Sequence, residues 1–218
     1  MKMIEPSLLS LNKDKAQEQL KQIQALGIKY VHYDVMDGKF VPPTSYTTEY
    51  LKDLEQLGIL PNVHLMVQDV EQWIDKYKDF KVNSITFHAE TQDVDRAIEL
   101  INKIHKMGCL AGISVKPETD LNQYQELLGE CDIVLIMSVN PGWGGQGFVD
   151  SAMINLVKAT QAKALYPKLI IQIDGGINFD YIKKLHSQVD WFVTGSWFFK
   201  NIDHMGQYLD EFKKLTNN

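Results

Sequence analysis

The stretch HYDVMDG, at residues 32–38, decides how the rest of the chain is interpreted. It follows an apolar pair and ends in an Asp-Gly turn signal, so it is predicted to be the carboxyl end of a β-strand. Because side chains alternate along a strand, His32, Asp34 and Met36 lie on one face. A histidine and an aspartate side by side at a strand end are typical of half a metal site. The other half should come from strands elsewhere in the chain.

Apolar segments rich in β-branched residues recur along the chain and alternate with amphipathic segments. The predicted strands are residues 4–9, 30–35, 62–67, 84–88, 110–115, 133–137, 169–174 and 191–195. The predicted helices are residues 13–26, 46–57 (the weakest), 70–78, 94–107, 121–128, 151–164 and 181–186. Such alternation predicts an α/β fold with a parallel sheet.

The chain length and the glycine motifs distinguish between an open doubly wound sheet and a closed barrel. Residues 1–218 contain no linker rich in proline or serine, so one domain is expected, with about 27 residues in each strand–helix unit. An open doubly wound sheet would more often carry an early G-x-G-x-x-G turn, and none follows the first strand. The prediction is therefore a single closed (β/α)8 TIM barrel.

The composition argues against several classes of protein. A formal net charge of −6 is not that of a protein that binds nucleic acid through a basic face. No apolar run approaches the roughly 20 residues of a membrane helix, and the first ten residues do not resemble a signal peptide. The two cysteines, Cys109 and Cys131, lie in apolar contexts. The expectation is a cytoplasmic protein with reduced thiols and no membrane or nucleic-acid partner.

In a (β/α)8 barrel, residues at the carboxyl ends of the strands converge on one mouth. Three predicted strands end in imidazoles and carboxylates: His32 and Asp34, His64, and Asp174. This mixed set of nitrogen and oxygen ligands suits a borderline divalent ion, namely Zn²⁺, Fe²⁺, Co²⁺ or Mn²⁺. A lone strand histidine is more often a hydrogen-bonded core residue, but four such groups at strand ends favour a site. His88 also ends a strand and is expected to line the pocket.

A glycine-rich segment, SVNPGWGGQGF at residues 138–148, follows the sixth predicted strand. Its unshielded backbone N–H groups suit an oxyanion or a mobile lid, although a plain flexible connection explains the segment equally well. Barrels often bind phosphate between the loops after strands seven and eight. Those loops contain Gly175 and Gly176, and Gly195 and Ser196. The sequence therefore predicts a phosphate beside these four residues, opposite the metal.

With these motifs in place, the chain resembles the ribulose-phosphate 3-epimerase family. The matching segments appear in family order: PSLLS (6–10), HYDVMDGKFVP (32–42), VHLMV (63–67), FHAE (87–90), LIMSVNPGWGGQGF (135–148), IDGGIN (173–178) and TGS (194–196). The resemblance implies a TIM barrel of the ribulose-phosphate-binding type that interconverts D-ribulose 5-phosphate and D-xylulose 5-phosphate. It also implies a role in the pentose phosphate pathway and a homo-oligomer.

The resemblance assigns roles to individual residues. It implies one divalent metal ion held by His32, Asp34, His64 and Asp174, with Asp34 and Asp174 also acting as the acid/base pair on opposite faces of the substrate. The residues near the substrate or its phosphate would be Ser7, His64, Gly142, Trp143, Gly144, Gly145, Gly175, Gly176, Gly195 and Ser196. The residues that line the reaction centre would be Met36, Met66, His88 and Met137.

The chemistry explains these residue types. Inverting a carbon next to a carbonyl requires removing a proton from one face and returning one to the other, which two opposed bases do. The cis-enediolate between the two steps is negatively charged, and a chelated divalent cation stabilises it. Apolar methionines would keep water away from this intermediate, and the loop around Trp143 would close over the substrate.

Three rival functions remain at this point. The nearest is 3-epimerisation of a six-carbon ketose phosphate such as D-allulose 6-phosphate by the same machinery. Decarboxylation or aldol cleavage in similar barrels uses Asp-x-Lys-x-x-Asp, and the corresponding string DVMD at residues 34–37 has no lysine. A catalytically idle sugar-phosphate-binding protein would not need the intact set of four ligands.

Overall fold

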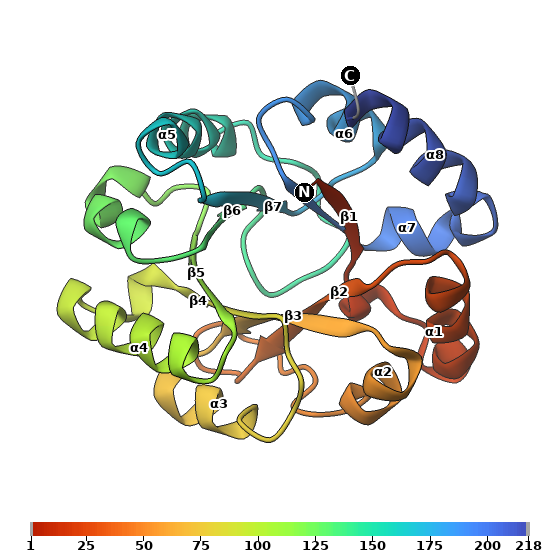
Figure 1. Cartoon of the computed structure of the whole chain (residues 1–218), viewed down its shortest axis with the longest axis horizontal. Helices are drawn as coiled ribbons and strands as arrows, with labels where there is room; N and C mark the ends of the chain where they lie inside the picture. Colours follow the sequence, from red (N-terminus) through yellow and green to blue (C-terminus); the bar gives the residue numbers. More distant parts are fainter. Residues whose placement is uncertain (1, 217–218) are drawn as a thin grey trace.

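The computed structural model describes residues 2–216, in which eight parallel strands form one sheet that curls into a barrel (Figure 1). The strands are β1 Met3–Pro6, β2 Tyr30–Met36, β3 Leu60–Met66, β4 Ser84–His88, β5 Leu110–Val115, β6 Ile133–Met137, β7 Ile170–Asp174 and β8 Trp191–Thr194. They pair in the order β1-β8-β7-β6-β5-β4-β3-β2, and a parallel bridge between Ser7 and His32 brings the two outer strands together. The predicted (β/α)8 barrel is confirmed. The predicted single domain extends to residues 1, 217 and 218, which lie outside the described part.

The helices surround the barrel (Figure 1). They are α1 Ala16–Ala25, α2 Leu51–Leu57, α3 Val70–Lys76, α4 Val94–Lys106, α5 Ala152–Leu165, α6 Phe179–Leu185, α7 Ser196–Lys200 and α8 Met205–Thr216. The predicted helix at residues 121–128 is instead a 3₁₀ segment, Leu121–Gly129, which Tyr124 interrupts with a non-helical backbone (φ −120°, ψ 22°). The predicted segments do not include α8.

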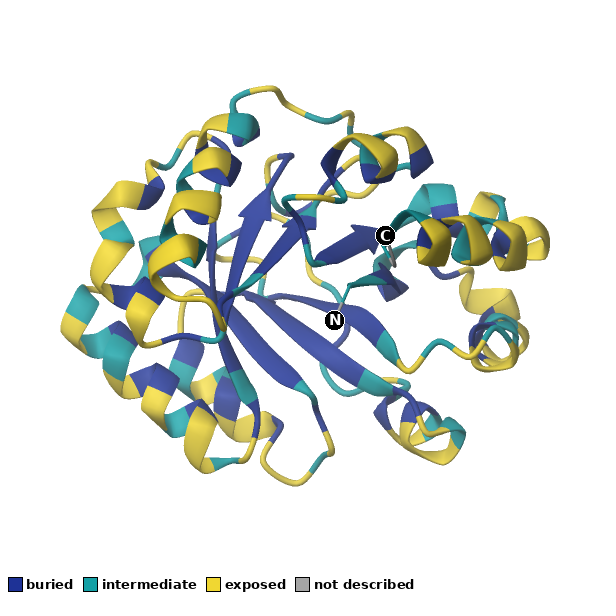
Figure 2. Ribbon diagram, turned by 45° about the horizontal axis from the view of Figure 1, so that its top comes forward, coloured by how far each residue is buried: buried dark blue, intermediate teal, exposed yellow. Residues whose placement is uncertain are grey.

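The main hydrophobic core lies between the sheet and the helices. Every second residue of β2, Val31, Tyr33 and Val35, is fully buried in this layer together with helix residues such as Leu20 and Leu54. Figure 2 shows the result: the strands are buried, and the exposed residues lie on the outer faces of the helices and in the loops. Burial on both faces is the usual condition of parallel strands, so the inward-facing residues are also enclosed.

The interior of the barrel is divided between apolar and polar side chains. Leu135, Met137 and Val139 form a separate apolar cluster on one side. The polar side chains buried elsewhere in the interior include Glu5, His32, Asn62, His64 and Gln172. Buried polar groups persist only where they have hydrogen-bond or charge partners. This polar part of the interior leads directly to the mouth at the carboxyl ends of the strands.

Within residues 2–216, no helix has the length and apolar character that crossing a bilayer requires.

Candidate active site

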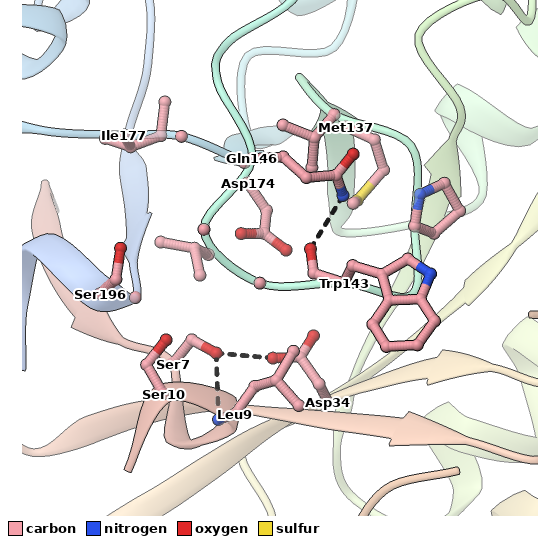
Figure 3. A pocket seen from close by; sticks show the side chains of 18 of the residues that line it. Ser7, Leu9, Ser10, Asp34, Met137, Trp143, Gln146, Asp174, Ile177 and Ser196 are labelled. Carbon is pink, nitrogen blue, oxygen red and sulfur yellow. Dashed lines mark hydrogen bonds between the residues drawn. The ribbon is translucent and has the colours of Figure 1, made fainter. Parts of the chain in front are cut away.

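A cavity opens at the carboxyl ends of the strands, where Asp34 of β2 and Asp174 of β7 approach it from two sides (Figure 3). It has a volume of about 280 Å³. The predicted residues that line it are Ser7, Asp34, Met36, Met66, Met137, Gly142, Trp143, Gly144, Gly145, Asp174, Gly175, Gly176, Gly195 and Ser196. His32, His64 and His88 are among the buried polar residues of the barrel and do not line the cavity.

The four predicted metal ligands converge beneath this cavity. One potential ligand atom from each of His32, Asp34, His64 and Asp174 lies within 4.8 Å of those of the other three. His32 Nε2 is 3.3 Å from Asp34 Oδ1, 3.3 Å from His64 Nδ1 and 3.7 Å from Asp174 Oδ2. His64 Nδ1 is also 3.3 Å from Asp34 Oδ1.

These separations fit a divalent cation. Ligand atoms about 2.0–2.1 Å from a tetrahedral zinc ion are about 3.3 Å from one another. Two imidazole nitrogens facing each other also need a proton or a cation between them, because two lone pairs repel. Two neutral imidazoles and two carboxylates would supply the nitrogen and oxygen set that Zn²⁺, Fe²⁺, Co²⁺ or Mn²⁺ accepts.

A chain of hydrogen bonds fixes which nitrogen of His64 faces the cluster. His88 Nδ1 lies 3.2 Å from Glu90 Oε2, and His88 Nε2 lies 3.1 Å from His64 Nε2. A carboxylate only accepts hydrogen bonds, so His88 donates to Glu90 and accepts from His64. The His64 Nδ1 lone pair is thereby left for the cluster, an arrangement found around metal-binding histidines.

His88 therefore lies behind His64, whereas the sequence predicts that it lines the cavity. Its ring stacks on that of His64 with centroids 5.1 Å apart and is fully buried. Its partner Glu90 was not singled out in the sequence, although the FHAE motif contains it. Glu90 lies in a 3₁₀ turn, Ala89–Thr91, directly after β4, so strand alternation does not place its side chain beside His88.

The surroundings of the two carboxylates shift their pKa values in opposite directions. Burial disfavours the charge on Asp34, but His32 and His64 outweigh it and lower the pKa of Asp34. Burial raises the pKa of Asp174 to about 7, and the charges of Asp34 and Glu5 add to this effect against His32. Acid/base pairs in enzymes commonly show such divergence.

The imidazoles respond to the same charges. Burial alone would lower the pKa of His32, but Asp34, Glu5 and Asp174 raise it well above its usual value. Burial lowers the pKa of His64 to about 4, because only Asp34 opposes the effect substantially. The carboxylates around His32 therefore favour its protonated form, whereas burial favours the neutral form of His64.

Ser7 holds one oxygen of Asp34 at the cavity. Its hydroxyl donates to Asp34 Oδ2 at 2.7 Å and accepts from the Leu9 N–H at 3.3 Å (Figure 3). The other oxygen, Oδ1, faces the two imidazoles. The carboxylate thus presents one oxygen to the cluster and one to the cavity, and the Ser45 hydroxyl anchors its backbone carbonyl at 2.7 Å.

The glycines of the opposite wall permit close approach between loops. Gly175 has φ +122°, and a Cβ there would lie 2.6 Å from Val139 Cγ2. At Gly195, a Cβ would lie 2.7 Å from Ser10 Oγ. Ser138, a residue with no predicted role, donates to the carbonyl oxygens of Asp174 at 2.9 Å and Gly175 at 2.6 Å and so fixes this turn.

The glycine-rich loop is closed on itself beside the cavity. The Gln146 side chain donates to the carbonyl oxygen of Trp143 at 2.8 Å (Figure 3) and to that of Asn140 at 2.7 Å. Its base is joined by a hydrogen bond from Val149 N–H to the Ser138 carbonyl at 2.8 Å. The Trp143 side chain remains 63% exposed at the tip.

Comparison with known proteins bears on this site. A model described as the ribulose-phosphate 3 epimerase family matches residues 3–199. The chain belongs to this family. A ribulose-phosphate 3-epimerase of Mycoplasma pneumoniae is 40% identical over 195 residues, 89% of this chain and 88% of that protein. Ribulose-phosphate 3-epimerase 1 of Cupriavidus necator is 36% identical and covers 93% of this chain and 86% of its own.

A more distant relative is the chloroplastic ribulose-5-phosphate-3-epimerase of Arabidopsis thaliana, which is 33% identical over 93% of this chain and 73% of its own. The prediction of an epimerase of this family is confirmed. Among solved structures, KGPDC from Streptococcus mutans has a TM-score of 0.70 at 12% identity, covering 97% of each chain. Tryptophan synthase of Mycobacterium tuberculosis has a TM-score of 0.60 at 10% identity, covering 98% of this chain and 89% of its own. These two likenesses show the barrel fold alone.

Proposed function

We propose that the protein interconverts D-ribulose 5-phosphate and D-xylulose 5-phosphate as a metal-dependent 3-epimerase. The observation that carries the proposal is the pair Asp34 and Asp174, two carboxylates from different sides of one mouth that share a cluster of imidazoles. Membership of the ribulose-phosphate 3-epimerase family supports the choice of reaction. Residues 1–218 would act as one catalytic domain, in the cytoplasm and as a homo-oligomer.

His32, Asp34, His64 and Asp174 would hold the metal. A divalent cation bound there supplies positive charge, which stabilises the negative charge that a deprotonated ketose carries on its oxygens. The Glu90–His88–His64 chain keeps the lone pair of His64 Nδ1 directed at the cluster.

The two carboxylates move the protons. One removes the proton at carbon 3 from one face of the sugar, which leaves a planar cis-enediolate, and the other delivers a proton to the opposite face. Asp34 has its Oδ2 at the cavity, where Ser7 hydrogen-bonds it. Asp174, whose pKa burial raises to about 7, is suited both to accept and to release a proton near neutral pH.

The remaining walls would bind and shield the sugar. Met36, Met66 and Met137 line the cavity and would limit the access of water to the enediolate. The backbone of Gly175, Gly176, Gly195 and Ser196 would receive the phosphate, with Gly142–Gly145 as its cover. The exposed Trp143 side chain would close over the substrate.

Turnover assays test the proposal. The purified protein loaded with Mn²⁺ or Zn²⁺ should convert D-ribulose 5-phosphate to D-xylulose 5-phosphate, and a chelator should abolish conversion until the ion is restored. Measuring kcat/KM for D-allulose 6-phosphate in parallel tests the substrate. A clear preference for the six-carbon sugar would overturn the assignment of the pentose, and turnover of neither sugar would overturn the proposed function.

A further inference from the structure

A third carboxylate, Glu5 of β1, lies inside the barrel next to the metal cluster. Its side chain is fully buried, and alternation along the chain places it in the same inward row as Ser7. The Asn62 amide donates to Oε1, and the Gln172 amide donates to Oε2 at 2.5 Å. A carboxylate without solvent persists only when its oxygens have such donors.

The direction of these hydrogen bonds is set by a wider network. Asn62 Oδ1 accepts from Asn83 Nδ2 at 2.7 Å and from Ser84 Oγ at 2.8 Å, so its amide nitrogen must face Glu5. Both side-chain oxygens of Glu5 therefore act as acceptors. Within residues 2–216, His32 is the only basic side chain that lies within ion-pair distance of this carboxylate.

His32 has a buried ring nitrogen without a hydrogen-bond partner on the side of Glu5. Its Nδ1 is buried without a hydrogen-bond partner and lies 3.8 Å from Glu5 Oε2, while its Nε2 faces the cluster. His64 shows what such a ligand needs: its outer nitrogen is tied through His88 to the carboxylate of Glu90. For His32, the carboxylate in the corresponding position is Glu5.

We propose that Glu5 is a positioning residue for His32. Its carboxylate favours the form of His32 that carries a proton on Nδ1, which leaves Nε2 free to bind a divalent cation. This inference rests on the proposed metal-dependent function. Partners of this kind typically change metal affinity by about 10- to 100-fold.

Titration with Co²⁺, followed by visible absorption in the absence of sugar, tests the role. Glu5→Gln keeps the shape but removes the charge, and we expect its Co²⁺ affinity to be about 10- to 100-fold weaker than that of the wild type. The matched control is Ser84→Ala, which removes a hydrogen bond from the same network without touching His32. Its affinity should stay within about threefold of the wild type. Equal losses in both variants, or no loss in Glu5→Gln, would overturn the inference.

Two further measurements cover a variant that fails to fold. Glu5→Asp retains the charge and should bind Co²⁺ more tightly than Glu5→Gln. In Zn²⁺-loaded wild-type protein, nitrogen NMR of the histidines should show a proton on His32 Nδ1, and an unprotonated Nδ1 would contradict the proposal. If wild-type protein turns over the sugar and Glu5→Gln binds Co²⁺ equally well, only this inference fails. If wild-type protein binds no Co²⁺, the proposed metal site fails with it.

Discussion

The two ends of the barrel use aspartates differently. At the amino-terminal rim, Asp132 and Asp190 each accept a hydrogen bond from a backbone N–H of the preceding strand and pair with a basic side chain. At the carboxyl-terminal mouth, Asp34 and Asp174 instead converge on one cluster. Asp132 Oδ2 accepts from Ala111 N–H at 2.9 Å, and Asp190 Oδ2 accepts from Ile171 N–H at 2.8 Å. Their basic partners are His105 and Lys163.

The same residue type thus joins strands at one end and, in the proposed reaction, carries protons at the other. Each rim carboxylate has its own backbone donor and its own basic partner, so it joins neighbouring strands. Asp34 and Asp174 share the same imidazoles and face a cavity, so in the proposed reaction each can gain or lose a proton. Substitutions at the two ends should therefore separate turnover from stability.

The largest expected effect is on turnover at the mouth. Asp174→Asn removes one of the two proton carriers, so kcat should fall by about 10²- to 10⁴-fold. The free energy of unfolding should not fall comparably, because the substitution removes a buried negative charge. Asp190→Asn at the rim is the matched control, since its amide oxygen can still accept from Ile171, and it should retain turnover. Steady-state kinetics and urea denaturation of both proteins measure the contrast.

Metal affinity should depend steeply on pH. An entering cation competes with a proton on His32, because the neighbouring carboxylates raise the pKa of His32 against the effect of burial. Below about pH 7 the cation also competes with a proton on Asp174. Affinity should therefore fall with decreasing pH, and more steeply below about pH 7, where Asp174 also gains a proton. Calorimetry at pH 6, 7 and 8 in two buffers measures affinity and proton release. A pH-independent affinity would contradict the charge assignment.

The rim should affect stability alone. Asp190→Ala leaves the Ile171 N–H without its acceptor and Lys163 without its partner, so the free energy of unfolding should fall by about 1–3 kcal/mol. The value of kcat/KM at 25 °C should not change. Asp132→Ala should cost less, because the Asp132 side chain is 36% exposed and that of Asp190 is 15% exposed. A large loss of turnover in Asp190→Ala would contradict the claim that the rim aspartates affect stability alone.

The smallest expected effect concerns the loop beside the mouth. Trp143 contributes an exposed side chain but no ligand or proton carrier. Trp143→Ala should raise KM a few-fold and leave the metal affinity unchanged. Trp143→Phe should be nearly neutral. A loss of metal binding in Trp143→Ala would show that the loop supports the cluster directly.

The fold and the ligand cluster were accessible from sequence for one physical reason. Parallel strands of a barrel bring their carboxyl ends to one mouth, so His32, Asp34, His64 and Asp174 could be placed together from strand positions alone. The position of His88 behind His64 depends on ring packing and on Glu90, which strand alternation does not determine.

Glu5 shows the same limit most clearly. Alternation along β1 places it inside the barrel, but only the folded chain brings it beside the amides of Asn62 and Gln172, which make its burial tolerable. Those partners come from strands that are distant in sequence. Their meeting depends on the register of each strand pair, which the strand pattern alone does not specify.

Solvent deuterium exchange at carbon 3 tests the two-base account most directly. Metal-loaded wild-type protein in D₂O should incorporate deuterium at carbon 3 of D-ribulose 5-phosphate. Asp34→Asn and Asp174→Asn, each loaded with the same ion to the same occupancy, should both lose conversion to D-xylulose 5-phosphate by about 10²- to 10⁴-fold, and only the variant that lacks the base facing the carbon 3 hydrogen of D-ribulose 5-phosphate should also lose the exchange. Exchange at the wild-type rate in both variants would contradict the assignment of Asp34 and Asp174 as the two proton carriers.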